Sequence, residues 1–338
     1  MPKTTIKDVA LQTGLSTATV ERVINGRGGV TQDTIHKVLA AAERLQYGIR
    51  QNRTNRRTIR IEVILVRPET SFFARVNQAF ERIAASLDRS VIIHRTFVAE
   101  GDHLSMARHI DNPSFRRSGL IICAQDHPRV AASLRRVRAA GVEVVQIVTR
   151  CDDRDVPYVG IDNYAAGRSA AFYMSGMLAG RAGHFVALCH SGIYMNHRER
   201  VNGFSDFIAE RGAASGHAVS EVMIGHDDDV RSADLLAQAL DRNPDVIGVY
   251  SVGGGDEGVA SVLQKWALKG RPIFWVAHEL TERKKGYFKS GLLDICLDEA
   301  PEVQARRSLD LILRKLGVME TAVDTSQVRF VTVNAQNV

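Results

Sequence analysis

The chain has 338 residues and a mass of 37.2 kDa, enough for two or three domains of ordinary size. Hydrophobic residues make up 45% and charged residues 24% of it, which excludes a mostly disordered chain, a collagen-like fibre and a coiled-coil rod. The net charge of +6 is uneven, because residues 1–60 hold 11 Lys and Arg against four acidic residues, a net of +7. The remaining 278 residues hold 33 basic and 34 acidic groups. A polyanion-binding head on a neutral body is therefore predicted.

The sequence lacks the usual signals for export and membrane insertion. Its first eight residues contain no apolar run that could act as a signal peptide. No stretch of about 18 uncharged apolar residues could span a membrane. The four cysteines form no C-x-x-C pair, which disfavours a structural zinc site or a thioredoxin-type motif. We expect a cytoplasmic protein with buried, reduced thiols, no metal and no cofactor.

Three short helices are predicted in the N-terminal segment. Thr5 and Asp8 have the spacing of a capping box at the start of the first helix. Gly14 breaks this helix and can supply the positive φ that a tight turn needs. Ser16 is placed to cap the second helix. Two short helices joined through a glycine are typical of a helix-turn-helix, whose second helix enters the DNA major groove.

The second helix begins with small side chains that allow a close approach to DNA. The hydroxyls of Ser16, Thr17 and Thr19 can bond base edges or phosphates, and Ala18 can contact a thymine methyl group. Arg22, one turn further on, can reach a phosphate or a guanine. A small helical bundle with solvated charges is the alternative interpretation.

This head resembles that of the LacI (lac repressor-like) family of bacterial transcription regulators. The resemblance rests on Thr-Ile-Lys-Asp-Val-Ala at 5–10, Gly-Leu-Ser at 14–16, Thr-Val at 19–20 and Arg-Val-Ile-Asn at 22–25. It implies that Thr17, Ala18 and Arg22 read the operator. Ser16, Thr19 and Asn25 match positions that contact the DNA backbone. The DNA-binding set in the head is therefore Thr5, Ser16, Thr17, Ala18, Thr19, Arg22 and Asn25. Glu21 stands where the family often has a small polar residue; a cytosine contact and an outward orientation both stay open.

Residues 48–60 are polar and arginine-rich, and they predict a linker between domains. The family resemblance implies a hinge helix here, with a leucine that wedges into the minor groove. Arg56 occupies the position of that leucine, which puts the wedge and the DNA kink in doubt. We expect Arg50, Arg53 and Arg56 to neutralise phosphates or enter a narrow minor groove, and a flexible basic tether is the alternative.

From residue 61 on, short apolar strands alternate with helix-length segments, a pattern typical of doubly wound parallel sheets. There are too many strands for one lobe. The expected fold is an all-α helix-turn-helix head followed by a two-lobed α/β body of the periplasmic-binding-protein type. The predicted domains are a head at 1–47, a hinge at 48–60 and a body at 61–338, with lobes at 61–160 plus 299–324 and 161–298 plus 325–338. The strands are predicted at 61–66, 91–94, 120–124, 142–148, 158–161, 185–188, 246–252, 273–277 and 295–297.

The strand ends are rich in carboxylates and arginines, with aromatic residues nearby. This composition suits a polyhydroxylated ligand. Ligands of such sheets bind at the carboxyl ends of the strands, so two facing lobes predict a cleft there. The body also resembles LacI-family regulators and periplasmic sugar-binding proteins. Together these observations predict ligand contacts from Phe72, Phe73, Arg150, Asp162, Arg198, Arg200, Asp256, Glu279 and Asp298.

Three weaker motifs are interpreted as structural. Residues 253–258 fit G-x-G-x-x-G, but Asp256 and Glu257 would meet a pyrophosphate with like charge. His190, His197 and Glu199 have irregular spacing for a metal site. The acidic run at 227–229 lacks the rest of a calcium loop and is expected to be a solvated turn.

The sequence therefore predicts a DNA-binding transcriptional regulator, a repressor and not an enzyme. It would bind a pseudo-palindromic double-stranded operator as a homodimer, without a membrane partner. A small carbohydrate between the lobes would change operator affinity allosterically. The alternatives are a cytosolic sugar-binding receptor without regulatory DNA binding and a nucleotide-binding enzyme.

Overall fold

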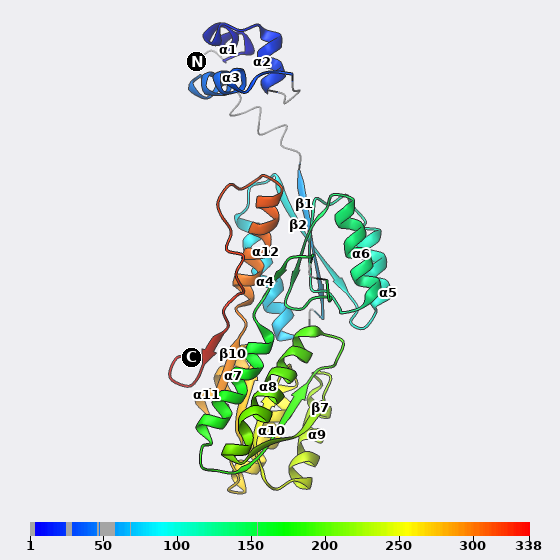
Figure 1. Ribbon diagram of the computed structural model, residues 1–338, viewed down its shortest axis with the longest axis vertical. Helices are drawn as coiled ribbons and strands as arrows, with labels where there is room; N and C mark the ends of the chain where they lie inside the picture. Colours follow the sequence, from blue (N-terminus) through cyan, green and yellow to red (C-terminus); the bar gives the residue numbers. More distant parts are fainter. Residues whose placement is uncertain (1–3, 25–28, 46, 48–57, 68, 154) are drawn as a thin grey trace. The chain divides into compact units, whose positions relative to one another are not determined.

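In the computed structural model, the described residues are 4–24, 29–45, 47, 58–67, 69–153 and 155–338 (Figure 1). The chain divides into two compact units, Met1–Thr58 and Ile59–Val338. Most of the predicted hinge, including Arg50, Arg53 and Arg56, lies outside the described residues, as does Asn25.

The first unit contains the three predicted helices, α1 (Ile6–Thr13), α2 (Thr17–Ile24) and α3 (Gln32–Arg44). Each helix contributes apolar side chains at helical spacing, so their buried faces meet in one small core. The buried core residues are Val9, Ala10, Val20, Val38, Ala41 and Ala42.

The helix ends of the head form as the sequence predicts. The Asp8 carboxylate accepts hydrogen bonds from the Thr5 backbone N–H at 2.7 Å and from the Thr5 hydroxyl at 2.8 Å. Gly14 ends α1 in the left-handed region, with φ 67°. The Ser16 hydroxyl accepts from the Thr19 N–H at 3.1 Å and caps α2.

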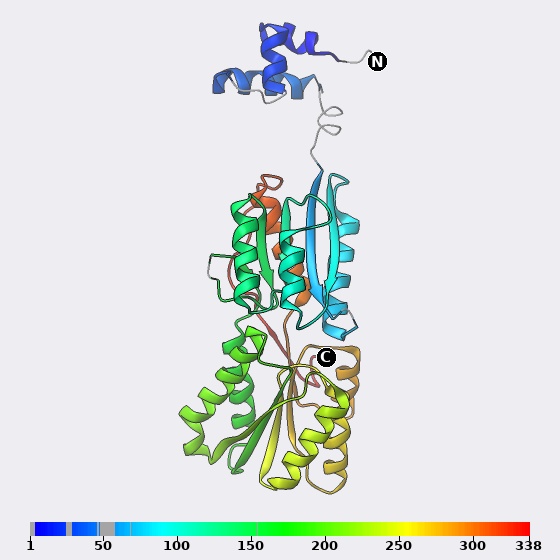
Figure 2. The same ribbon diagram turned by 90° about the vertical axis from the view of Figure 1, so that its right-hand side faces the viewer.

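The second unit contains two mainly parallel sheets, each within its own lobe (Figures 1 and 2). The lobe 1 sheet has strand order β2-β1-β3-β4-β5. The three inner strands of this sheet are mostly buried, as expected for a parallel sheet covered on both faces, and its two edge strands are partly exposed. The strands are β1 (Ile59–Val66), β2 (Val91–Val98), β3 (Gly119–Ile122), β4 (Glu143–Ile147) and β5 (Tyr158–Val159).

The lobe 2 sheet has strand order β11-β10-β9-β8-β6-β7, and only β11 runs antiparallel to its neighbour. Its strands are β6 (Gly183–Cys189), β7 (His217–Ile224), β8 (Val246–Ser251), β9 (Phe274–His278), β10 (Ile295–Asp298) and β11 (Val331–Val333). The sequence did not predict β7 and β11. Both are edge strands with exposed positions, so they lack the continuous apolar run that marks the buried strands.

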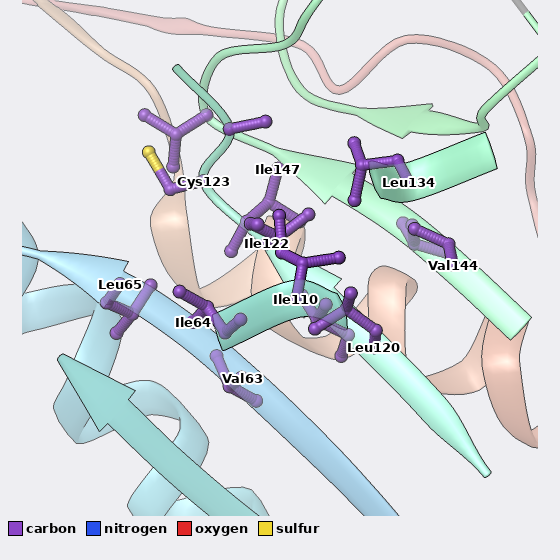
Figure 3. Close-up of a cluster of buried hydrophobic side chains, with 14 of the residues drawn as sticks. Val63, Ile64, Leu65, Ile110, Leu120, Ile122, Cys123, Leu134, Val144 and Ile147 are labelled. Atoms are coloured by element: carbon purple, nitrogen blue, oxygen red, sulfur yellow. The ribbon is translucent and has the colours of Figure 1, made fainter. Parts of the chain in front are cut away.

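Helices cover both faces of each sheet. In lobe 1, α4 (Ser71–Ser86) and α12 (Pro301–Lys315) pack together on one face, and α5 (His103–Asp111) and α6 (Pro128–Ala139) on the other (Figure 1). The lobe 1 core includes Val63, Ile122 and Leu134 (Figure 3). In lobe 2 the two faces carry separate cores, one under α7 (Asn163–Met177) and α8 (Met195–Ser215) and one under α9 (Asp229–Arg242), α10 (Asp256–Leu268) and α11 (Glu282–Lys289).

The chain passes between the lobes near residues 161, 299 and 328. Ile161 and Val328 form a parallel bridge where two of the crossing segments meet. After β10 the chain returns to lobe 1, where α12 packs against α4 and β4. Each lobe is therefore built from separate stretches of sequence.

All four cysteines are free and buried, as the sequence predicts. Burial raises the pKa of the Cys189 thiol to about 11, so it is protonated at neutral pH. Among the described residues, no helix combines the length and apolar character needed to cross a membrane.

Candidate functional site

A cavity of about 800 Å³ lies between the two lobes, where the carboxyl ends of both sheets face each other. Nearly every strand contributes lining from the residues that follow it, as expected at the switch points of doubly wound sheets. Lobe 1 provides Arg67, Glu100, Cys123, Val148 and Thr149, and lobe 2 provides His190, Asp227, Gly253, Gly254, Gly255, Asp256, Glu279 and Glu299.

Several of these strand ends have an unusual backbone. Arg67, Val148, Asp227 and Glu279 all have positive φ, between 45° and 66°, although none is glycine. A left-handed conformation costs about 1–3 kcal/mol for such residues, and it tends to persist at functional sites. The turns aim the following side chains along the cavity wall instead of continuing the strands.

One polar cluster connects the lobes across the cavity. The Arg67 guanidinium lies 2.7 Å from the Asp227 carboxylate. His190 lies 3.0 Å from Glu100 and 3.4 Å from Asp227, while the Tyr194 hydroxyl donates to Glu100 at 2.8 Å. Arg67 and Glu100 come from lobe 1, and the other three residues come from lobe 2.

Ionisation within this cluster follows from the pairing. Burial lowers the pKa of His190, but the carboxylates of Glu100 and Asp227 outweigh burial, and the net shift is upward. Burial raises the pKa of Asp227, but the nearby His190 and Arg67 oppose burial, and the net shift is downward. Burial lowers the pKa of His197 to about 3, so its imidazole is neutral.

A second buried cluster is centred on Arg200, in α8. Its side chain is 2% exposed and lies 2.6 Å from Glu299. It also donates from Nε to Asn163 at 2.9 Å and from Nη1 to the Val252 carbonyl at 3.0 Å. Arg200 thus connects α7, α8 and the strand ends of lobe 2 at the cavity wall.

Five of the nine predicted ligand residues line the cavity: Phe72, Phe73, Arg200, Asp256 and Glu279. The Phe72 and Phe73 rings pack edge to face, with centroids 5.3 Å apart and an interplanar angle of 76°. They lie in the first turn of α4, so lobe 1 supplies the aromatic wall and lobe 2 most of the carboxylates.

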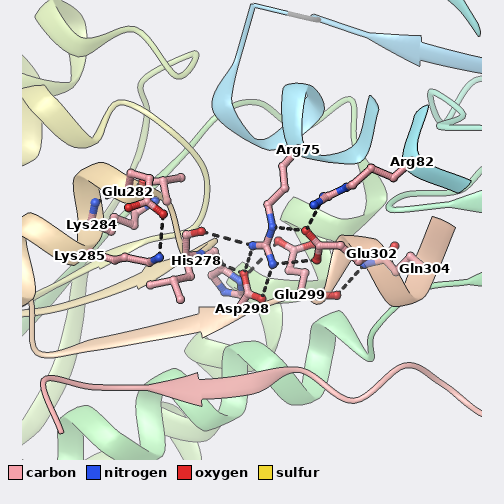
Figure 4. Close-up of polar contacts among 12 residues, drawn as sticks. Arg75, Arg82, His278, Glu282, Lys284, Lys285, Asp298, Glu299, Glu302 and Gln304 are labelled. Atoms are coloured by element: carbon pink, nitrogen blue, oxygen red, sulfur yellow. Dashed lines mark hydrogen bonds and ion pairs between the residues drawn. The ribbon is translucent and has the colours of Figure 1, made fainter. Parts of the chain in front are cut away.

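The other four predicted ligand residues are outside the cavity lining and have structural partners. Arg150 pairs with Glu199 at 2.8 Å, and Arg198 pairs with Asp126. The Asp162 carboxylate caps α7 by accepting from the Ala165 N–H at 2.8 Å. The fourth, Asp298, lies 2.6 Å from the Arg75 guanidinium (Figure 4).

Arg75 is a lining residue that the sequence did not predict. It extends from α4 and also pairs with Glu302 at 2.7 Å, so its guanidinium fills the place next to Asp298 (Figure 4). The ion pair between lobe 1 and the end of β10 explains why Asp298 does not face the cavity.

Other lining residues were also missed, including Arg67, Glu100, His190 and His197. The available signal was position, because Arg67, Glu100 and His190 each follow a strand by one or two residues. The run at 227–229 does form a turn that leads into α9, and Asp228 is exposed, but Asp227 is not a solvated residue. Asp227 is an interlobe ion-pair partner, and Asp228 caps α9 by accepting from the Arg231 N–H at 2.7 Å.

Within the described part of the chain, no group of three or more His, Cys, Asp or Glu side chains is placed to hold a metal ion.

The glycine loop at 253–255 is satisfied by neighbouring carboxylates. Asp227 accepts from the Gly254 N–H at 2.7 Å, and Asp229 accepts from the Glu257 and Gly258 N–H groups at 2.9 and 3.2 Å. A pyrophosphate would need the same N–H groups and would meet both carboxylates with like charge. This arrangement disfavours dinucleotide binding.

In the head, the residues predicted to read DNA are exposed on one side of α2. Thr17, Ala18 and Arg22 are exposed, whereas Val20 between them is fully buried in the core. Ser16 and Thr5 are exposed at the starts of α2 and α1, and Thr19 is half-buried. The helix therefore offers small side chains and one arginine to a groove.

Residues 5–48 match the family of bacterial regulatory proteins of the lacI type, and residues 61–317 match the family described as the periplasmic binding protein domain. The chain belongs to the lacI family of bacterial regulatory proteins. Its body is a periplasmic binding protein domain.

Curated relatives include catabolite control protein A of Priestia megaterium, 25% identical over 219 residues, 62% of each chain. The HTH-type transcriptional regulator RegA of Clostridium saccharobutylicum is 28% identical over 168 residues, 47% of this chain and 48% of the relative. The HTH-type transcriptional repressor PurR of Pectobacterium carotovorum is 27% identical over 175 residues, 48% of this chain and 50% of the relative. The chain therefore spans about half to three fifths of the length of these relatives.

Solved structures show the fold of the body. A solute-binding protein of Burkholderia graminis in complex with D-arabinose has a TM-score of 0.75 at 19% identity, covering 84% of this chain and 97% of the other. The glucose-galactose binding protein GanP of Geobacillus stearothermophilus has a TM-score of 0.71 at 15% identity, covering 83% and 98%. These similarities confirm the predicted two-lobed α/β fold.

Proposed function

We propose that this protein is a DNA-binding transcriptional repressor whose operator affinity is changed by a small carbohydrate in the interlobe cavity. The observation that carries the proposal is the presence, in one chain, of a helix-turn-helix with exposed Thr17, Ala18 and Arg22 and of a polar cavity between two lobes. The family membership and the regulators among its relatives support it.

The cavity chemistry supports a carbohydrate. The edge-to-face pair of Phe72 and Phe73 can cover the apolar C–H face of a sugar ring, and the carboxylates opposite can accept hydrogen bonds from hydroxyl groups. The similar proteins of known structure include ones bound to D-arabinose and D-allose.

Coupling between cavity and head requires that the ligand bind two lobe arrangements with different affinity. The interlobe ion pairs Arg67–Asp227 and Arg150–Glu199 hold the present arrangement. A ligand that binds these charged groups in place of their ion-pair partners would shift the equilibrium between the two lobe arrangements. In a homodimer, a change in lobe orientation would alter the spacing of the two heads on a pseudo-palindromic site. We assign the protein to the cytoplasm and to regulation, not catalysis.

The test is a gel-shift titration of the full chain with DNA selected from a random pool, repeated with a panel of mono- and disaccharides. We expect a specific complex at moderate salt and a change of its affinity with at least one sugar. A sugar that binds the protein without altering any DNA complex would favour a cytosolic receptor. Absence of a specific DNA complex would overturn the regulatory role.

A further inference from the structure

Three neighbouring strands of lobe 2 each lead into one carboxylate at the cavity. Asp256 begins α10 after β8, Glu279 follows β9, and Glu299 follows β10. Since β8, β9 and β10 are adjacent in the sheet, these residues form one edge of the cavity, here called the carboxylate rim.

Among the residues that the structure describes, two cations form ion pairs with the three groups of the carboxylate rim. Lys284 lies 2.6 Å from Asp256, and Arg200 lies 2.6 Å from Glu299. His278, 3.7 Å from Glu299, adds no charge, because burial and neighbouring cations keep its pKa well below the ordinary value. Among the described residues, the Glu279 carboxyl has neither a hydrogen bond nor an ion pair. The rim therefore has one surplus acidic group.

The rim also has unused hydrogen-bond acceptors. Oε2 of Glu299 and Oδ1 of Asp256 accept no hydrogen bond, although the Glu299 side chain is only 2% exposed. Buried polar atoms are normally satisfied, so these oxygens point to donors supplied by a ligand. The nearby Arg75 cannot supply them, because its guanidinium is engaged with Asp298 and Glu302 (Figure 4).

A neutral polyol would satisfy these acceptors but leave the surplus charge in place. A protonated amine supplies up to three N–H donors together with a positive charge, and a charge-assisted hydrogen bond is stronger than a neutral one. We propose that the ligand is an aminated carbohydrate, or a comparable small polyol, whose single ammonium group binds the carboxylate rim at Glu279. This inference rests on the proposed function, since it specifies the chemical class of its effector.

Protonation of the unliganded site is consistent with this assignment. Burial raises the pKa of Glu279 to about 8, with Lys284 opposing the shift and Glu299, Asp256 and Asp227 adding to it. At neutral pH the surplus group is thus mostly neutral, which avoids an unpaired buried charge. An ammonium ligand would take the place of that proton, so binding should release a proton from the site.

The test is isothermal titration calorimetry of the full chain with matched pairs: D-glucosamine and D-glucose, D-galactosamine and D-galactose, D-mannosamine and D-mannose. At about pH 6.5, where the amines are charged, we expect at least one amino sugar to bind about tenfold or more tightly than its parent. The N-acetyl derivative of that sugar should lose the advantage. Titration in two buffers of different ionisation enthalpy should show proton release.

Two variants locate the effect. Glu279→Gln should abolish the preference for the amino sugar and the proton release while keeping weak binding of the parent sugar. Glu210→Gln removes an exposed carboxylate that lies outside the cavity lining, so the preference should remain. Circular dichroism of both variants checks that they fold.

The outcomes separate this inference from the proposed function. Neutral sugars that bind as tightly as their amino partners, or an amino preference that survives Glu279→Gln, would overturn the inference and leave the carbohydrate effector intact. If no sugar of either kind binds while the DNA complex forms, both the inference and the carbohydrate effector fail, and the regulatory role stands.

Discussion

The Arg67 guanidinium and the Asp227 carboxylate lie 2.7 Å apart, although 160 residues separate them in the chain. Arg67 follows the first strand of lobe 1, and Asp227 follows the edge strand β7 of lobe 2. Their side chains are 16% and 18% exposed, so solvent screens the ion pair only partly. The pair is a direct link between the lobes in the cavity lining.

Substitutions of Arg67 and Asp227 should lower stability, and their effects should not be additive. Arg67→Gln and Asp227→Asn should each lower the free energy of unfolding by about 1–3 kcal/mol. The reason is that each substitution deprives the remaining half-buried charge of this ion-pair partner. The double variant should lose less than the sum of both. Urea denaturation measures all three. Arg242→Gln, which removes an exposed pair with Glu221, should change the free energy of unfolding by less than about 1 kcal/mol. Strict additivity of the cavity variants would contradict the link.

Arg200 is expected to matter for folding as well as for ligand binding. Arg200→Ala leaves Glu299 as an uncompensated buried charge and should destabilise the protein by about 3–5 kcal/mol. Adding Glu299→Gln should recover part of that loss, because the substitution removes the charge while keeping the shape. Thermal or urea unfolding of both variants checks this. A double variant no more stable than Arg200→Ala would refute the charge explanation.

His190 should make stability depend on pH near neutrality. Its pKa is raised in the folded protein, whereas the pKa values of its partners Glu100 and Asp227 are lowered, so the carboxylates stay ionised. The stabilisation is complete below the unfolded pKa of about 6.5 and is lost as the pH rises through the raised value. Relative to His190→Gln, the wild-type free energy of unfolding should fall as the pH rises above about 6.5. Parallel curves for the two proteins would disprove this role of His190.

In the head, Arg22 should contribute to operator affinity. Arg22→Ala should weaken binding to selected DNA by about 1–3 kcal/mol, because the exposed arginine lies one turn into α2, on its exposed side. Lys7→Ala removes the same charge from α1 and serves as the control for general electrostatic attraction. Fluorescence anisotropy at several salt concentrations separates the two. Equal losses in both variants would mean that Arg22 acts only through its charge.

Local patterns in the sequence were sufficient for the head and for most strands. The capping box of Thr5 and Asp8, the turn at Gly14 and the cap at Ser16 all depend on residues within a few positions of one another. Such interactions are decided by nearest-neighbour geometry, which a sequence displays directly. The buried strands were visible for a similar reason, because parallel strands covered on both faces need continuous apolar runs.

The cavity was only half predictable. The sequence indicated that charged residues follow the strands, but several of them compete for the same partners once the lobes meet. Arg75, on a helix of lobe 1, pairs with Asp298 and thereby removes it from the lining, while Arg150 and Arg198 pair with Glu199 and Asp126.

Asp227 is the opposite case, a residue that was not predicted to line the cavity but does so. Its acidic turn becomes half-buried opposite Arg67 only when the two sheets face each other. Which charges are paired and which face a ligand depends on contacts between segments far apart in the chain. A sequence lists the charged groups, but pairing is a matter of distance and burial, and folding sets both.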